Sequence, residues 1–201
     1  MATTRALKTV YHLLDERNWA AVQAQGLLST AGLAERSGPE AVARLGLQRL
    51  QGEQLACGAY IRDQRPMPPA ALDRCLAGGL RAADWYRLLN SRVFFWIDRD
   101  RLDRQRRACG STPQRVLVVD AERMLHVHGQ AAAVTPINTG NAMRAAAARN
   151  LSTFVPYPRW VRDAWASEHT GGSSRPASHR PVELTVADAV PDILDYIIRM
   201  E

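Results

Sequence analysis

The sequence predicts a single α+β domain that covers residues 1–201. Helical patterns dominate the first half, strand patterns the second, and no regular alternation of strand, helix and strand runs through the chain. A length of 201 residues is enough for one domain with a substantial core. These observations favour one α+β domain over a series of βαβ units.

The first half is expected to open with a strand over residues 8–13. A helix follows, which Asp15 or Asn18 can cap and Gly26 can end. Residues 39–51 predict a second helix from apolar residues at helical spacing. These residues are Val42, Leu45 and Leu50.

Residues 70–89 are expected to hold one or two helices, which Gly78-Gly79 divides or bends. After residue 90 the spacing of the apolar residues changes from a helical pattern to strand patterns. Residues 92–97 (RVFFWI) predict a strand, residues 99–108 a short helix, and residues 114–120 (QRVLVVD) a buried strand. Residues 124–128 predict one more short strand.

Residues 142–150 are rich in alanine and predict a helical turn or two. Residues 153–158 predict an extended segment, and the glycine-serine stretch 171–176 predicts a flexible loop. That loop leads into a strand over residues 181–187, which carries Glu183. Residues 190–200 close the chain with a strand or a helix.

Composition excludes several classes of protein. No run of 18 apolar residues predicts a membrane span, and the first residues lack the apolar region of a secretory signal, so we expect a cytoplasmic protein. Three cysteines without a CxxC pair support neither disulfides nor a zinc knuckle. The net charge of +6 allows phosphate-bearing partners, although the arginines of residues 99–107 alternate with acids as on a solvated helix.

Two titratable residues on predicted strands are candidates for function. Glu183 interrupts an apolar run, and a carboxylate there either faces solvent on a half-buried strand or lines a catalytic cleft. His12 is either a core histidine with one satisfied ring nitrogen or a ligand contact. His126 and His128 would share one strand face, but without a third ligand we expect no metal site. The sequence contains no GxSxG, P-loop or Rossmann glycine pattern.

Several short blocks recur in the order of a known family. They are YHLLDERNW, GLLS, IRDQRPM, LLNSRVFFW, PINTG and VELTVADAVPDI. In order and spacing the chain resembles the DarT-like ADP-ribosyltransferases over residues 10–195, as an uncharacterised bacterial relative of the DUF4433 or DUF7002 kind. The resemblance implies an ADP-ribosyltransferase-like split β-sheet with N-terminal helices, and NAD bound in a cleft between two small sheets.

The resemblance also implies roles for individual residues. Glu183 would be the catalytic carboxylate and His12 would contact a ribose of NAD. The aromatic strand would help to hold the nicotinamide, and the loop over residues 168–180 would read the acceptor. The residues of that aromatic strand are Phe94, Phe95 and Trp96.

The expected chemistry suits these residue types. Cleavage of the bond between nicotinamide and ribose develops an oxocarbenium-like charge, which a carboxylate bonded to the ribose 2′-hydroxyl stabilises. Arg62, which we count with Glu183 as catalytic, and Arg65 are candidates for the pyrophosphate, although a simple turn also accounts for them. Asn138 stands in a polar turn that either lines the cleft and touches NAD or is a plain Asn-Thr-Gly turn.

We therefore expect an NAD-dependent ADP-ribosyltransferase that modifies a nucleic-acid base (DNA or RNA) or a protein side chain. A toxin-like enzyme of this kind would have an antitoxin-like partner and no membrane partner. Leu14 replaces the threonine usual in the DNA-modifying branch, so the acceptor stays open. Three alternatives remain: an RNA 2′-phosphotransferase, which would need a denser basic cleft, a non-catalytic nucleotide- or nucleic-acid-binding module, and an NAD hydrolase.

Overall fold

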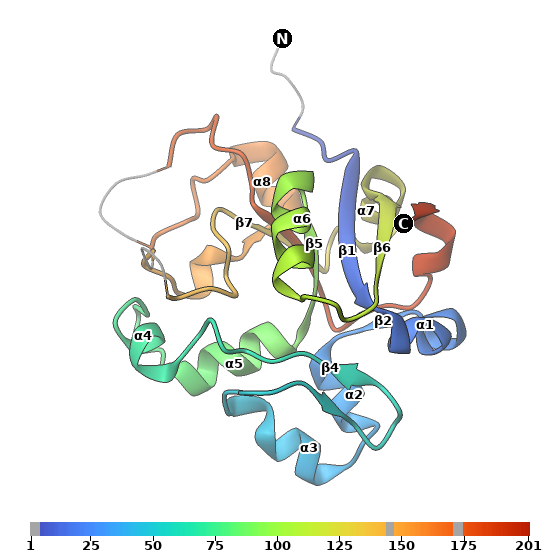
Figure 1. The fold of residues 1–201 in the computed structure, drawn as a ribbon. Helices are drawn as coiled ribbons and strands as arrows, with labels where there is room; N and C mark the ends of the chain where they lie inside the picture. The colour runs from blue at the N-terminus through green and yellow to red at the C-terminus, as the bar shows by residue number, and fades with distance from the viewer. Residues whose placement is uncertain (1–4, 144–146, 171–174) are drawn as a thin grey trace.

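A seven-stranded antiparallel sheet forms the centre of the protein. The computed structural model describes residues 5–143, 147–170 and 175–201 (Figure 1). The strand order is β11-β6-β1-β5-β9-β7-β8, and every neighbouring pair is antiparallel. The strands are β1 (Thr9–Asp15), β5 (Arg92–Trp96), β6 (Gln114–Asp120), β7 (Ala132–Thr135), β8 (Val155–Pro156), β9 (Glu183–Ala187) and β11 (Ile197–Met200).

Helices and short ladders surround this sheet, which confirms the α+β class. In Figure 1, α2 to α5 gather with β4 below the sheet, and α6 lies in front of β5 with β1 beside it. Two-residue strands pair as β2 (Leu27–Leu28) with β10 (Ala189–Val190) and as β3 (Glu53–Gln54) with β4 (Tyr60–Ile61). The helices are α1 (Trp19–Gln25), α2 (Thr30–Glu35), α3 (Pro39–Ala43), α4 (Pro69–Asp73), α5 (Ala82–Asn90), α6 (Arg99–Ala108), α7 (Ala121–His128) and α8 (Tyr157–Asp163); the 3₁₀ turns are η1 (Glu16–Asn18), η2 (Arg44–Gly46), η3 (Leu151–Thr153) and η4 (Ile193–Tyr196).

Strand β6 is buried on both faces, which explains its unbroken apolar run. Leu117 and Val119 join the main core of the protein. Val116 and Val118 point to the other face, where they pack with Leu102 of α6 in a smaller core. Each face of the sheet is therefore covered by apolar side chains in this region.

The sheet opens between β1 and β5. Strand β1 pairs with β6 at seven positions, but with β5 only where Tyr11 lies opposite Trp96. Beside that single pair, the Nδ1 atom of His12 lies 2.8 Å from the carbonyl oxygen of Phe94. A histidine side chain thus takes the place of backbone hydrogen bonds where the two strands diverge.

Several predicted elements agree closely with the structure. The strand at residues 92–96, the helix at 99–108 and the strand at 114–120 have the predicted bounds, except that β5 ends one residue earlier. Helix α6 begins where the Asp98 carboxylate accepts a hydrogen bond from the Arg101 backbone N–H. Gly26 ends α1 with a positive φ of 75°, as expected of a glycine at that position.

The predicted strand at residues 124–128 is wrong, because these residues belong to helix α7. Asp120 ends β6 and caps the helix by accepting a hydrogen bond from the Arg123 N–H. Residues two apart on a helix point in different directions, so His126 and His128 do not share a face. His128 instead contacts Asp192, at 2.6 Å.

The predicted helix over residues 39–51 is also too long. Helix α3 ends at Ala43, and Leu50 is 64% exposed, because the chain turns away after η2 to form β3. In the alanine-rich segment 142–150, the described residues 142, 143 and 147–150 are not helical. The end of the chain holds β10, η4 and β11 rather than one element, and helix α2 and strand β7 were not predicted.

Candidate active site

A cavity of about 800 Å³ lies at the opening between β1 and β5. This volume is in the range of small-molecule sites. Its walls come from β1, β5, β9 and α6, from the turn over residues 138–141, and from residues of the segment 49–67. His12 and Glu183, from strands near the two ends of the chain, both line it.

Glu183 is buried in this wall, with 4% of its surface exposed. It begins β9 opposite Trp96 on one side and Thr135 on the other. Its Oε2 atom accepts hydrogen bonds from the hydroxyls of Thr135 (2.9 Å) and Thr139 (2.8 Å). The Thr139 N–H lies 3.3 Å from both carboxylate oxygens. Atom Oε1 therefore keeps lone pairs with which to accept a hydrogen bond from a ligand.

Burial raises the pKa of Glu183 from 4.5 to about 7, because it disfavours the charged carboxylate. The hydrogen bonds from Thr139 and Thr135 and the charge of Arg149 act in the opposite direction. The group therefore changes charge close to neutral pH. A carboxyl group whose pKa is shifted in this way, inside a cavity, is a candidate for chemistry.

His12 is neutral at physiological pH. A carbonyl oxygen can only accept, so the Nδ1 atom bonded to Phe94 carries the proton and Nε2 is left as an acceptor. Burial is the main cause that lowers the pKa of His12 from 6.5 to about 4; the hydrogen bond to Phe94 acts in the opposite direction, and the nearby charge of Arg62 adds to the effect of burial. The ring is half-buried and lies 5.6 Å, between ring centroids, from Phe95.

Arginine dominates the charge of the cavity. Five arginines line it, and Glu183 is its one acidic side chain within the described part of the chain. Arg101, Arg104, Gln105 and Ala108 form one face of α6, at the i, i+3, i+4 and i+7 spacing of a helix. Such a wall favours an anionic ligand. The five arginines are Arg49, Arg62, Arg92, Arg101 and Arg104.

Arg62 lies inside the cavity wall and Arg65 does not. The Arg62 guanidinium lies 3.2 Å from the Cys109 sulfur and donates to the side-chain oxygen of Gln114. Arg65 is exposed and its guanidinium bonds to Asp63, two residues earlier, at 3.0 Å. That local turn is the alternative considered from the sequence. This turn accounts for the position of Arg65. The geometry therefore does not support the predicted contact between Arg65 and NAD.

The other predicted residues also border the cavity. Phe94, Phe95 and Trp96 all line it, and the Trp96 Nε1 donates to the Gln105 oxygen at 2.6 Å. Asn138 lines it too, and its side-chain oxygen accepts from the Gly140 N–H at 3.0 Å. The Asn-Thr-Gly turn is thus both a regular turn and part of the cavity wall. The catalytic and cofactor-binding roles of these residues remain predictions.

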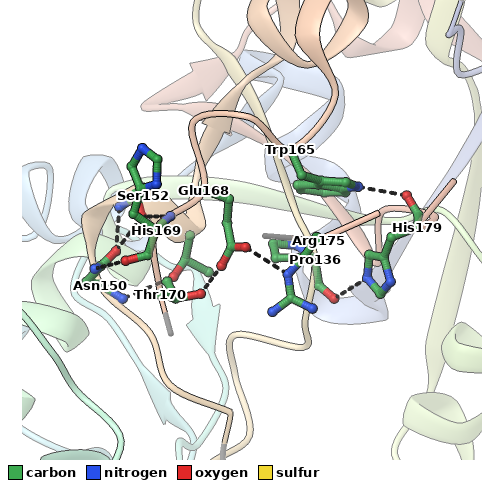
Figure 2. A network of polar contacts seen from close by, with 10 residues as sticks. Pro136, Asn150, Ser152, Trp165, Glu168, His169, Thr170, Arg175 and His179 are labelled. Atoms are coloured by element: carbon green, nitrogen blue, oxygen red, sulfur yellow. Dashed lines mark hydrogen bonds and ion pairs between the residues drawn. The ribbon is translucent and has the colours of Figure 1, made fainter. Parts of the chain in front are cut away.

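The segment before β9 is held by a network of polar contacts (Figure 2). The Glu168 carboxylate pairs with Arg175 at 2.9 Å and accepts from the Thr170 hydroxyl. Trp165 donates to the His179 carbonyl at 2.8 Å, and the His179 ring lies 3.0 Å from the Pro136 carbonyl. This network ties the predicted acceptor loop, residues 168–180, to the chain that follows Thr135. Residues 171–174 of that loop lie outside the described residues.

Sequence reasoning missed three residues that surround the carboxylate. All three are buried: Thr135 and Thr139 donate hydrogen bonds to Glu183, and Arg149 donates to the carbonyl of Thr139. Thr139 could have been suspected from its place in the quoted PINTG block. Nothing in the sequence pattern marks Arg149, which was expected at the end of a helix.

Within residues 5–143, 147–170 and 175–201, no group of three histidine, cysteine or acidic side chains could hold a metal ion. None of the helices in these ranges has the length and apolar character needed to span a bilayer.

The model of a family of unknown function (DUF7002) matches residues 8–197. The chain belongs to this family. No curated protein matches it. The family description assigns no activity, so the resemblance to ADP-ribosyltransferases remains a prediction.

Proposed function

We propose that this chain is an NAD-dependent ADP-ribosyltransferase. It would cleave the bond between nicotinamide and ribose and transfer ADP-ribose to a nucleic-acid base or a protein side chain. The observation that carries the proposal is the shared cavity: a neutral histidine and a buried carboxylate, from opposite ends of the sequence, line one cavity with five arginines. An ADP-ribosyltransferase-like fold is part of this proposal, and the opening of the sheet between β1 and β5 supports it.

The carboxylate of Glu183 is suited to stabilise positive charge on a ribose. Its Oε1 atom can accept a hydrogen bond from the 2′-hydroxyl of the nicotinamide ribose. The ionised carboxylate then opposes the charge that develops on the sugar as the C–N bond lengthens. Thr135 and Thr139 fix the other oxygen, so the group does not have to reorient during the reaction.

The remaining cavity residues are suited to hold the substrate. The unprotonated Nε2 of His12 can accept a hydrogen bond from a ribose hydroxyl. Arg62 and Arg49 on one wall, and Arg101 and Arg104 on α6, can pair with the two phosphates. The aromatic residues of β5 offer a surface for the nicotinamide ring.

The atoms of the transfer balance without a further reagent. The C–N bond breaks and nicotinamide leaves with the electron pair, as a neutral molecule. The acceptor then forms a bond to the ribose C1′ atom and loses one proton. Water can take the place of the acceptor, in which case the protein is an NAD hydrolase.

Nicotinamide release from NAD tests the proposal. The purified protein is incubated with NAD alone and with DNA, RNA or a protein extract, and both nicotinamide and labelled acceptor are measured. Glu183→Gln should reduce release by at least 100-fold, the scale of losing one preorganised group. Asp15→Asn is the matched control, because Asp15 is equally buried but lies outside the cavity.

The outcomes separate the alternatives. Release without a labelled acceptor indicates the NAD hydrolase. No release, together with no thermal shift on addition of NAD, contradicts the proposal; no release but a thermal shift supports the non-catalytic binding module.

The arginine-lined cavity favours one second candidate, an RNA 2′-phosphotransferase. Such an enzyme needs a dense basic cleft, and the five arginines provide one that the sequence did not reveal. Incubation with NAD and an RNA bearing an internal 2′-phosphate tests it. Loss of that phosphate from the RNA, dependent on NAD, would support this candidate over ADP-ribose transfer.

A further inference from the structure

Arg149 is a buried arginine without a carboxylate partner. Its exposed surface is 1%, and it forms no salt bridge with any residue that the structure describes. Its guanidinium donates instead to three carbonyl oxygens, each at 3.1 Å. These belong to Thr139, Asn141 and Ala147. The guanidinium also lies 5.8 Å from the centre of a Trp85 ring, but a buried cation without a paired anion is costly.

The partners of Arg149 identify what it holds. Two of its nitrogens, Nη1 and Nη2, donate hydrogen bonds to carbonyl oxygens of the same turn, those of Thr139 and Asn141. The Trp85 Nε1 also donates to the Thr139 carbonyl, at 3.3 Å. The planar guanidinium presents these donors in a fixed geometry, which a lysine cannot reproduce. The position of the turn is therefore determined on one side by Arg149 and Trp85.

The other side of the same turn faces Glu183. The Thr139 N–H and hydroxyl both point to its carboxylate, the hydroxyl at 2.8 Å. A single residue thus connects the guanidinium to the carboxylate. The backbone of Arg149 is fixed as well: its N–H donates to the Cys75 carbonyl at 2.8 Å, and its carbonyl accepts from the Ala77 N–H at 2.9 Å.

We propose that Arg149 is a positioning residue for Glu183: it holds the turn over residues 139–141 in the geometry in which Thr139 donates both its N–H and its hydroxyl to the carboxylate. Arg149 is not among the residues that line the cavity. Its catalytic consequence rests on the proposed function. Its effect on the carboxylate does not, and can be measured without any substrate.

The charges around the carboxylate are consistent with this role. The charge of Arg149 lowers the pKa of Glu183 and so opposes the effect of burial on that group. Burial lowers the pKa of Arg149, and the charge of Glu183 acts in the opposite direction. Loss of the turn geometry removes donors that favour the ionised carboxylate, which raises its pKa further. Arg149→Lys keeps the positive charge but cannot bridge both carbonyls. This variant therefore separates geometry from charge.

The test follows the titration of Glu183 by NMR with ¹³C-labelled glutamate side chains, using Glu183→Gln to assign the resonance. Four proteins are compared: the wild type, Arg149→Lys, Thr139→Val and the double variant. We expect each single variant to raise the titration midpoint by about one pH unit. The double variant should raise the midpoint by less than the sum of the two single shifts, because Thr139→Val already removes the hydroxyl that Arg149 positions and leaves only the Thr139 N–H to be displaced.

Two results would overturn the proposal. One is an unchanged midpoint in folded Arg149→Lys, which would make Arg149 a merely structural residue. The other is full addition of the two shifts in the double variant, which would mean that the two residues act independently. Trp85→Phe removes one donor to the Thr139 carbonyl and leaves both hydrogen bonds from Arg149 to the turn, so it should shift the midpoint less than Arg149→Lys does.

Nicotinamide release provides the second readout. Arg149→Lys should lower kcat about tenfold, because the carboxylate loses its fixed position. The KM for NAD should change less, about twofold, because the arginines and the aromatic strand residues that line the rest of the cavity do not contact Arg149. If the wild type releases no nicotinamide, the proposed function fails, and the NMR titration still decides the role of Arg149.

Discussion

Replacing Glu183 with glutamine is expected to stabilise the fold at alkaline pH far more than at acid pH. Burial raises the pKa of this group from 4.5 to about 7 in the folded protein. Each pH unit between the folded and unfolded pKa is worth about 1.36 kcal/mol. Ionisation of Glu183 in the fold therefore costs about 3 kcal/mol of stability above pH 7.

The sign follows from which state holds the proton more tightly. The folded state has the higher pKa, so between pH 4.5 and 7 it binds more protons than the unfolded chain. The contribution of Glu183 to stability is thus fully present below pH 4.5 and is lost as the pH rises through 7. Glutamine cannot ionise, and its carbonyl can still accept from the Thr139 N–H.

Urea unfolding of the wild type and Glu183→Gln at pH 4.5 and pH 8 measures the effect. The stability of the variant relative to the wild type should rise by about 3 kcal/mol between these two values. Asp15→Asn is the control: the hydrogen bond from Arg17 lowers the pKa of Asp15, so its stability difference should stay constant over this range. A change below about 1 kcal/mol for Glu183→Gln would refute the assignment of a raised pKa.

Three further predictions concern ligand binding and rate. Nicotinamide release should rise with pH about a midpoint near 7, as Glu183 ionises; a rate independent of pH between 5.5 and 8.5 would show that its ionisation does not matter. Arg62→Ala should weaken NAD binding about tenfold by calorimetry, and less so at high salt, whereas Arg65→Ala should leave it unchanged because Arg65 lies outside the cavity. His12→Phe should lower the free energy of unfolding by about 1–2 kcal/mol, since the Phe94 carbonyl loses its donor, and should also weaken NAD binding; unaltered binding would make His12 a core residue alone.

The local pattern of apolar and charged residues predicted an element correctly where the burial of its side chains matches the spacing typical of that element. The run QRVLVVD predicted β6 to the residue, because both of its faces are covered. The mixed charges of residues 99–107 indicated a solvated helix, and the structure adds Asp98 as its cap. Pattern failed over residues 124–128, where a short apolar run fits a strand and a helix equally well. The cap at Asp120 was the local signal that decides for the helix.

The sequence by itself determined the α+β class, the main strands and two candidate side chains, His12 and Glu183, because residue type and periodicity act over a few neighbouring positions. The tertiary structure alone decided that these two side chains share a cavity, that Arg62 lines it and Arg65 does not, and that Thr135, Thr139 and Arg149 surround the carboxylate. Hydrogen bonding, burial and charge at a site depend on distances between residues far apart in the chain. Such residues come within contact distance only when strands far apart in the sequence, such as β1, β5 and β9, have paired in the sheet.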